Sequence, residues 1–291
     1  MSLVEQAIKR LKRQQPIPDT RPVSNRSPHD RAPESVPELE DTASLARQIV
    51  VDNAALRAKG YFPEQERDRQ FADHYRRIKR PLVEKALSGN TAVGEPRVII
   101  VTSALPGDGK TFTSINLALS MALERDISVL LVDADVAKRH VTAIFELADQ
   151  PGLLDLLVDE DLEPEAVIVP TTTRGFSILP AGKPVAGTAE LLSSNRMRNV
   201  MRTLCTRNAR RIVLLDSSPL LITNEGQVLL KIAGQVVLVV RAGETPKRAV
   251  QAAIDLFDPQ QAGGVVLNQL QANAQDDYYV YGPYGTDGLE P

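Results

Sequence analysis

The stretch that decides the fold is RVIIVTSALPGDGKTF, residues 97–112. A short apolar run at its start is followed by a loop that contains Gly107, Asp108 and Gly109. Lys110 and Thr111 close the loop, and a helical pattern continues from them to residue 124. Strand, glycine loop, Lys-Thr pair and helix in this order predict a P-loop that binds the phosphates of a nucleotide.

The residue types in this loop suit phosphate chemistry. The two glycines let successive backbone N–H groups curl around phosphate oxygens without interference from a Cβ atom, and the helix N-terminus favours an anion. We expect Lys110 to reach the β- and γ-phosphates and the Thr111 hydroxyl to ligate Mg²⁺. The first glycine of the usual eight-residue pattern is replaced by Ala104.

Further apolar runs follow the P-loop, at residues 127–133, 176–180, 211–216, 235–240 and 263–268. They lack polar alternation, which is typical of strands buried on both faces of a parallel sheet. Helical segments lie between most of them. We therefore predict an α/β fold of the P-loop NTPase class over residues 95–272, with a doubly wound, mostly parallel sheet flanked by helices.

Three aspartates end or follow these runs. Asp133 closes the run at 127–133 and is soon followed by Asp135, and Asp216 closes the run at 211–216. Because the carboxyl ends of parallel strands face the ligand crevice, we expect all three beside the P-loop, where a Mg²⁺–nucleotide site needs carboxylates. A role in capping loops would explain one such aspartate but not three.

Two N-terminal parts precede the predicted domain. Residues 1–43 combine a short basic helix with a proline-rich arm whose composition predicts disorder. Residues 44–94 predict a helical extension. Pro63 suits the first turn of its helix, and Pro81 should kink or restart it. The apolar residues expected on one face of this helix are Phe71, Tyr75, Ile78 and Leu82.

The last part of the chain, residues 273–291, contains a tyrosine cluster. Four of the six tyrosines lie within DDYYVYGPYG, residues 276–285, namely Tyr278, Tyr279, Tyr281 and Tyr284. Nothing around them could bury four rings. A phenol, with a pKa near ~10, attacks a γ-phosphate more readily when a carboxylate accepts its proton, so we interpret this flexible tail as the phosphoryl acceptor. An adhesive assembly tail is the alternative interpretation.

Composition argues against several classes of function. The net charge of −3 gives no bias toward nucleic acid. Cys205 is the single cysteine and lies on the apolar face of a predicted helix, which excludes an internal disulfide and a zinc site built on several thiolates. No run approaches the ~20 apolar residues that span a bilayer. We therefore expect a cytoplasmic protein, which something else must bring to a membrane if it works there.

These motifs carry a family resemblance. Ala104–Thr111, Val129–Asp135 and Ile212–Asp216 resemble the Walker A, A′ and B motifs of bacterial protein-tyrosine kinases of the exopolysaccharide type, the BY-kinase family. The tyrosine-rich end is also a feature of that family. Within it, the chain is most similar to the XrtA-associated tyrosine autokinases. Pro219 is kept where the family often has two prolines.

The resemblance implies an ATP-dependent kinase that phosphorylates its own tyrosine cluster, between subunits, and regulates exopolysaccharide polymerisation and export. It places Asp133 and Asp216 with Thr111 in the Mg²⁺ shell. It makes Asp135 the base for the attacking tyrosine and brings Asn268 toward the adenine. The implied ATP-binding residues are Ala104, Pro106, Gly107, Asp108, Gly109, Lys110, Thr111, Phe112 and Asn268.

The resemblance also implies partners. A family motif of one acidic and two basic residues, which builds ring-like homo-oligomers, corresponds here to Asp73, Arg76 and Lys79. A membrane activator of the chain-length-determinant type and a tyrosine phosphatase are the other implied partners. No nucleic acid is expected.

Two other functions share the predicted fold. MinD/ParA-like positioning ATPases carry a lysine directly after the first P-loop position, where this chain has Leu105, and they lack a tyrosine tail. A non-catalytic, nucleotide-gated scaffold is the third interpretation. The intact Lys110 and the three aspartates argue against it.

Overall fold

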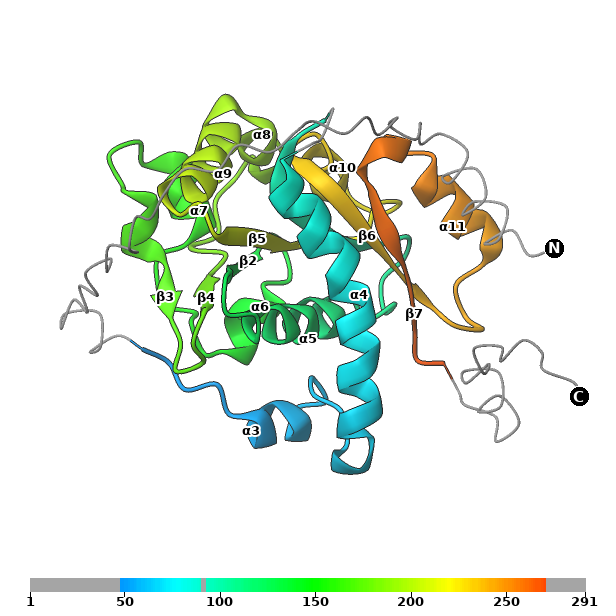
Figure 1. Cartoon of the computed structure of the whole chain (residues 1–291). Coiled ribbons are helices and arrows are strands. Elements are labelled where there is room, and N and C mark those ends of the chain that lie inside the picture. Colours follow the sequence, from blue (N-terminus) through cyan, green and yellow to red (C-terminus); the bar gives the residue numbers. More distant parts are fainter. Residues whose placement is uncertain (1–47, 90–92, 271–291) are drawn as a thin grey trace, which may run out of the picture.

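A seven-stranded sheet forms the centre of the computed structural model, which describes residues 48–89 and 93–270. The predicted N-terminal arm and the tyrosine cluster lie outside these residues. The strand order is β3-β4-β2-β5-β1-β6-β7 (Figure 1), and only the β3–β4 pair is antiparallel. The strands are β1 Glu95–Ser103, β2 Ser128–Asp133, β3 Val169–Pro170, β4 Phe176–Leu179, β5 Arg211–Asp216, β6 Ala233–Arg241 and β7 Ala262–Asn268. Each predicted apolar run forms a strand, and the two-residue β3 was not predicted.

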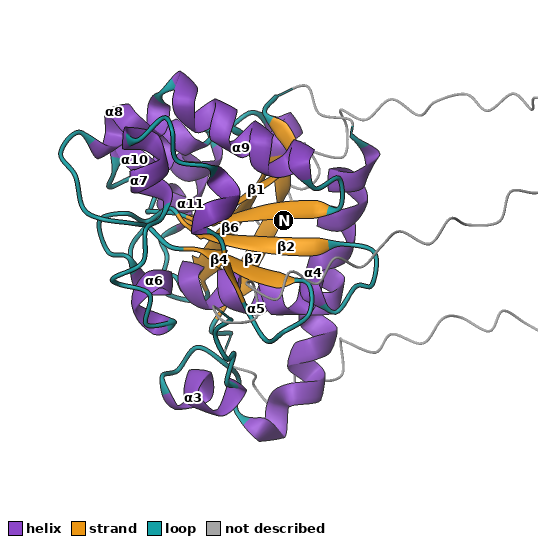
Figure 2. Ribbon diagram, turned by 90° about the vertical axis from the view of Figure 1, so that its left-hand side faces the viewer, coloured by secondary structure: helices purple, strands orange, loops and turns teal. Residues whose placement is uncertain are grey.

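Helices cover both faces of the sheet, as Figure 2 shows. They are α3 Asn53–Ala58, α4 Asp68–Ser88, α5 Lys110–Ala122, α6 His140–Ile144, α7 Leu153–Val158, α8 Thr188–Ser193, α9 Asn195–Arg207, α10 Asn224–Leu229 and α11 Lys247–Ile254. Successive residues of β1 point to opposite faces: Val98 and Ile100 pack with α7 to α11, and Ile99 and Val101 pack with α4 and α5. The predicted doubly wound, mostly parallel fold is confirmed.

Three neighbouring strands bring the functional residues together at their carboxyl ends. β5 lies between β1 and β2, and Asp216 at its end is in register with Asp133 of β2 and with Val101 of β1. The chain runs from β1 through the P-loop into α5. The carboxyl ends of β1, β2 and β5 are the place where doubly wound sheets bind their ligands.

The long helix α4 differs from the prediction in two ways. It begins at Asp68, after a 3₁₀ turn at Gln65–Arg67, so Pro63 precedes it. Pro81 lies inside the helix, which neither ends nor restarts there. Pro81 is exposed, and so is Arg77, whose carbonyl loses a helical donor and can bind water instead. The predicted apolar face packs inward, with Tyr75 and Leu82 buried.

Cys205 lies on the inner side of α9, as predicted. The helix buries Met197, Val200, Met201, Leu204 and Cys205 against the sheet. Burial raises the pKa of the Cys205 thiol to about 12. The thiol is therefore protonated at neutral pH and serves the core rather than chemistry.

Candidate functional site: a nucleotide site at the P-loop

The P-loop conformation depends on its two glycines. Gly107 has φ 87° and Gly109 has φ 94°, both in the left-handed region that side chains disfavour. A Cβ atom on Gly109 would also lie 1.9 Å from Asn268 Nδ2. Both the amide and the hydroxyl of Thr113 donate to the Gly109 carbonyl, at 2.9 and 3.0 Å, which starts α5. The loop therefore leads directly into a helix N-terminus, as predicted.

Asp108 fastens the loop to the rest of the domain. Its side chain is buried; Oδ1 accepts a hydrogen bond from Thr245 Oγ1 at 2.7 Å and Oδ2 accepts one from the Leu105 amide at 3.3 Å. The Asp108 carbonyl accepts a third from Asn268 Nδ2 at 2.9 Å, from the end of β7. Sequence reasoning missed Thr245, which no motif distinguishes. Asn268 lies beside the P-loop, and its contact with adenine stays a prediction.

Lys110 is the cation of the site. Its side chain is buried at the start of α5. Burial lowers its pKa, while the nearby carboxylates of Asp216, Asp135 and Asp108 oppose that shift. The predicted lysine and aspartates are therefore brought together, and Asp108 joins them.

Asp216, at the end of β5, is held by two hydroxyl groups of α5. Thr111 Oγ1 donates to Oδ2 and Ser114 Oγ donates to Oδ1, each at 2.8 Å. Burial and the neighbouring Asp133 raise the pKa of Asp216 to about 7, although the two hydroxyls and Lys110 oppose this. Ser114 was missed by sequence reasoning, although it lies one helical turn after the predicted Thr111.

Asp133, at the end of β2, has one satisfied oxygen and one that is free. The amide and the hydroxyl of Thr142 both donate to Oδ2 at 2.7 Å. Oδ1 is buried and has no hydrogen-bond partner among the described residues. Burial raises the pKa of Asp133 to about 6 despite the Thr142 bonds. A buried carboxylate oxygen without a partner is costly, so this atom is suited to an incoming cation or water.

Asp135 follows the end of β2 by two residues and is another buried carboxylate of the site. Its side chain is buried, and Oδ1 accepts a hydrogen bond from Ser218 Oγ at 2.8 Å. Ser218 follows β5 in the predicted Walker B segment. This single bond orients the carboxylate beside Lys110, whose pKa it influences.

These residues fit a Mg²⁺ ion bound together with nucleotide phosphates. Thr111, Asp216 and the free oxygen of Asp133 offer the hydroxyl and carboxylate oxygens that Mg²⁺ prefers. Within residues 48–89 and 93–270, no cluster of three or more Asp, Glu, His or Cys side chains is arranged to hold a metal by itself. Mg²⁺ normally takes one or two carboxylates, and phosphates and waters complete its shell. The donor set therefore agrees with the predicted cofactor.

The three residues of the predicted oligomer contact differ in exposure, and the contact itself stays a prediction. Asp73 and Arg76 are exposed and form an ion pair of 2.6 Å with each other. Lys79 is buried, and its Nζ contacts the Ser120 carbonyl and Glu124 Oε1, both at 2.7 Å. Lys79 is therefore buried within the chain and does not share the exposed face of Asp73 and Arg76. Each three-residue step rotates the side chain by about 60° around the helix, which brings the third residue to the buried side.

Comparison with known proteins identifies the family. The AAA domain family matches residues 96–258. The tyrosine-protein kinase YwqD of Bacillus subtilis is 31% identical over 186 residues, which span 63% of this chain and 77% of YwqD. The chain belongs to the bacterial tyrosine-protein kinases. The family and enzyme class expected from the sequence are thereby confirmed.

A solved structure supports this kinase assignment. The kinase domain of VpsO is 27% identical with a TM-score of 0.57, and the match covers 72% of this chain and all of that domain. Another relative is ExoP of Rhizobium meliloti, a succinoglycan biosynthesis transport protein, 31% identical over 72% of this chain. The chain spans only 26% of ExoP, and 24% of one further curated relative. In the part of the chain that the structure describes, no helix has the length and apolar character to span a membrane.

Proposed function

We propose that this chain is an ATP-dependent protein-tyrosine kinase that uses Mg²⁺ and phosphorylates tyrosines of its own C-terminal cluster. The observation that carries the proposal is the arrangement around Lys110. A buried lysine at the P-loop lies among Asp108, Asp135 and Asp216, and Thr111 is bonded to Asp216. This is the arrangement of groups that phosphoryl transfer from a nucleotide needs.

The P-loop residues hold and polarise the phosphates. Backbone N–H groups around Gly107 and Gly109 surround the β-phosphate, and Lys110 places its charge on the oxygens of the γ-phosphate. Thr111, Asp133 and Asp216 would hold Mg²⁺, which would supply a second positive charge beside the phosphates. Negative charge develops on the phosphate oxygens during transfer, and such a site catalyses the reaction mainly because it stabilises that charge.

Asp135 takes the proton of the acceptor. A tyrosine phenol with a pKa near ~10 is a weak nucleophile at neutral pH, and a carboxylate within reach of the hydroxyl assists its attack. Ser218 occupies one oxygen of Asp135 and fixes the orientation of the carboxylate. Thr142 holds Asp133, and Thr111 and Ser114 hold Asp216, in positions that suit metal binding. Asp135 is therefore the better base.

The acceptors are Tyr278, Tyr279, Tyr281 and Tyr284, and transfer occurs between subunits. The support is the sequence: these tyrosines follow the end of β7 by 10 to 16 residues along the chain, and Asn268 at that end contacts the P-loop. About seven residues separate Gln271 from Tyr278, at most ~25 Å when extended. That reach permits delivery to the site of a closely packed neighbour.

The cellular role that we propose is control of exopolysaccharide polymerisation and export at the inner membrane. The similarity to ExoP, named for succinoglycan biosynthesis transport, supports it. The proposed partners are a second copy of the chain, a membrane activator of the chain-length-determinant type and a tyrosine phosphatase. Asp73 and Arg76 remain the proposed contact between copies.

The direct test is incubation of the purified chain with Mg²⁺ and ATP, followed by phosphotyrosine detection and mass-spectrometric mapping. We expect phosphate on the tail of the wild type and none on a variant in which the four cluster tyrosines are phenylalanine. ATP hydrolysis without phosphotyrosine would contradict the proposal and favour a positioning ATPase. Mixing Lys110→Met with an active chain that lacks the tail tests the route, since only transfer between subunits can label the Lys110→Met tail.

A further inference from the structure

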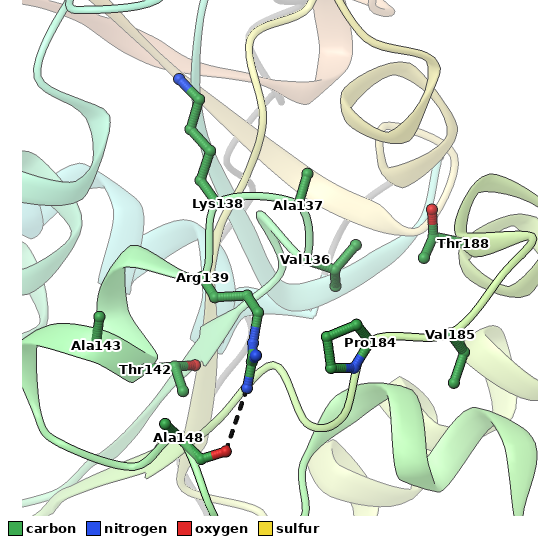
Figure 3. Close-up of a pocket in the computed structure, with 10 residues that line it drawn as sticks. All are labelled: Val136, Ala137, Lys138, Arg139, Thr142, Ala143, Ala148, Pro184, Val185 and Thr188. Carbon is green, nitrogen blue, oxygen red and sulfur yellow. Dashed lines mark hydrogen bonds between the residues drawn. The ribbon is translucent and has the colours of Figure 1, made fainter.

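A pocket of about 520 Å³ is lined by residues that directly follow Asp135 in the chain, beginning with Val136 (Figure 3). One wall is the loop 136–139, which follows Asp135 in the chain, and the opposite wall carries Pro184, Val185 and Thr188. The amides of Lys138 and Arg139 donate to the Asp135 carbonyl at 3.1 and 2.7 Å. The loop that lines the pocket is therefore folded against the backbone of the proposed base.

Arg139 brings an unsatisfied cation to this pocket. Among the described residues its guanidinium makes a single hydrogen bond, from Nη2 to the Ala148 carbonyl at 3.3 Å, which Figure 3 marks. Its Nε is buried and has no partner, and no carboxylate of residues 48–89 or 93–270 pairs with it. A guanidinium offers five N–H donors, and a partly buried one without an anion is costly. The remaining N–H donors of Arg139 are therefore suited to bind an anionic ligand.

The two charged side chains that line the pocket, Lys138 and Arg139, are both basic. Lys138 lies close enough to Lys110 to lower the pKa of that lysine further, so the pocket adjoins the phosphate site. On the other side, Thr188 Oγ1 donates to Glu225 Oε1 at 3.2 Å, and Glu225 itself does not line the pocket. Pro184 and Val185 are apolar. The charge of Arg139 opposes the rise that burial causes in the pKa of Asp133, although the two side chains form no ion pair.

We propose that this pocket binds the acidic pair Asp276–Asp277 in the tail of a second copy and so places Tyr278 at Asp135. The proposal rests on the proposed kinase function and gives it acceptor specificity. Asp277 immediately precedes Tyr278, and consecutive Cα atoms are 3.8 Å apart. This short step matches a pocket that starts one residue after Asp135. A bidentate guanidinium–carboxylate pair supplies both attraction and orientation.

The same geometry sets an order of phosphorylation. Tyr279 follows Tyr278, Tyr281 follows Val280 and Tyr284 follows Pro283, so none of these three has an acid directly before it. Tyr278 is therefore the first acceptor. Arg139 is a specificity residue in this scheme, and it takes no part in the proton or phosphoryl transfer.

The binding test uses a fluorescent peptide of residues 273–285 and a matched peptide with Asp276→Asn and Asp277→Asn. Each is titrated by anisotropy against the full chain carrying Lys110→Met, with its own Asp276 and Asp277 also changed to Asn so that its tail does not compete. We expect about tenfold tighter binding of the acidic peptide. Arg139→Gln should remove this preference. Arg139→Lys should keep part of it, because lysine retains the charge but not the paired N–H donors of the guanidinium. Thermal unfolding verifies that both variants are folded.

Equal binding of the two peptides, or an acid preference that survives Arg139→Gln, would overturn the pocket assignment. The peptide substitutions decide the question even if an Arg139 variant unfolds. A second measurement maps the earliest phosphorylated tyrosine of the active chain, which we expect to be Tyr278 and to lose its priority when Asp276 and Asp277 become Asn. Absence of all phosphotyrosine would refute the kinase proposal alone, since the binding measurement does not depend on transfer.

Discussion

Thr111 Oγ1 donates a hydrogen bond of 2.8 Å to Asp216 Oδ2, joining the residue after the P-loop lysine to the end of a strand 105 residues further along the chain. Ser114 holds the other oxygen of the same carboxylate. The carboxylate is thus oriented before any ligand arrives. Fixed geometry of this kind reduces the reorganisation that phosphate binding and transfer require.

Replacing Lys110 with methionine should abolish transfer without unfolding the domain. Removing a charge aimed at the transferring phosphate costs on the order of 100-fold or more in rate. Because burial lowers the pKa of Lys110, loss of its charge removes a desolvation cost, and we expect an unchanged or slightly higher melting temperature. The matched control is Lys231→Met, which changes an exposed lysine two residues after the end of α10. Autophosphorylation at the wild-type rate in Lys110→Met would refute the P-loop assignment.

The three aspartates should separate by role. Asp135→Asn removes the proton acceptor and should lower the transfer rate by about 100-fold, with little change in nucleotide affinity. Asp133→Ala and Asp216→Ala should weaken the dependence of nucleotide binding on Mg²⁺. Titration of a fluorescent nucleotide at several magnesium concentrations measures both effects. Equal loss of magnesium affinity in all three variants would reject Asp135 as the base.

Stability should fall with rising pH in the absence of Mg²⁺. The pKa values of Asp133 and Asp216 are raised to about 6 and about 7 in the fold, so the folded state binds protons more tightly than the unfolded state. Their protonation therefore stabilises the fold near pH 4, and this contribution is lost as pH rises through about 7. Melting curves between about pH 5 and 8 should show the decline, and Mg²⁺ with ADP should reduce it.

The matched control for this pH dependence is Asp216→Asn, which cannot ionise and should flatten the curve. A melting temperature that rises steadily across the same range in metal-free wild type would contradict the assignment. So would a stabilisation by Mg²⁺ with ADP that is as large near pH 5 as near pH 8, because protons and the metal compete for the same oxygens.

Asn268→Ala should loosen the P-loop. The bond from Asn268 Nδ2 to the Asp108 carbonyl would be lost, and a neutral hydrogen bond contributes about 1 kcal/mol. Nucleotide affinity should therefore fall by roughly fivefold. If Asn268 acts only through its bond to the P-loop, the affinities for ATP and GTP should fall by the same factor. A loss confined to ATP would instead support the predicted contact with adenine.

Phosphorylation of the tail should disperse assemblies of the chain. Each phosphotyrosine adds about −1.5 to −2 charges, so four add roughly −6 to −8, more than the whole present charge of −3. A phosphate on Tyr278 would face Asp133, Asp135, Asp216 and the nucleotide, which one guanidinium cannot neutralise. Light scattering should show larger particles for Lys110→Met than for the fully phosphorylated wild type. Identical scattering from the two would refute the charge switch.

The sequence predicted the site because the P-loop and the strand ends are local patterns. Lys110, Asp133, Asp135 and Asp216 each follow an apolar run, and parallel pairing brings the ends of such runs together. Thr142, Thr245 and Ser218 could not be assigned to Asp133, Asp108 and Asp135, because those contacts depend on tertiary packing between segments without a motif. Lys79 was misplaced since its burial depends on α5, which packs against that side of α4.

The anchoring of the last described strand determines which substrates can compete. β7 ends at Asn268, against the P-loop, and Tyr278 follows ten residues later. In an assembly of closely packed copies, a short tether of this kind would keep the tail of one copy near the site of its neighbour at an effective concentration in the millimolar range. The tethered tyrosines would then be privileged substrates of the proposed kinase. An unattached protein needs a docking surface of its own to displace them.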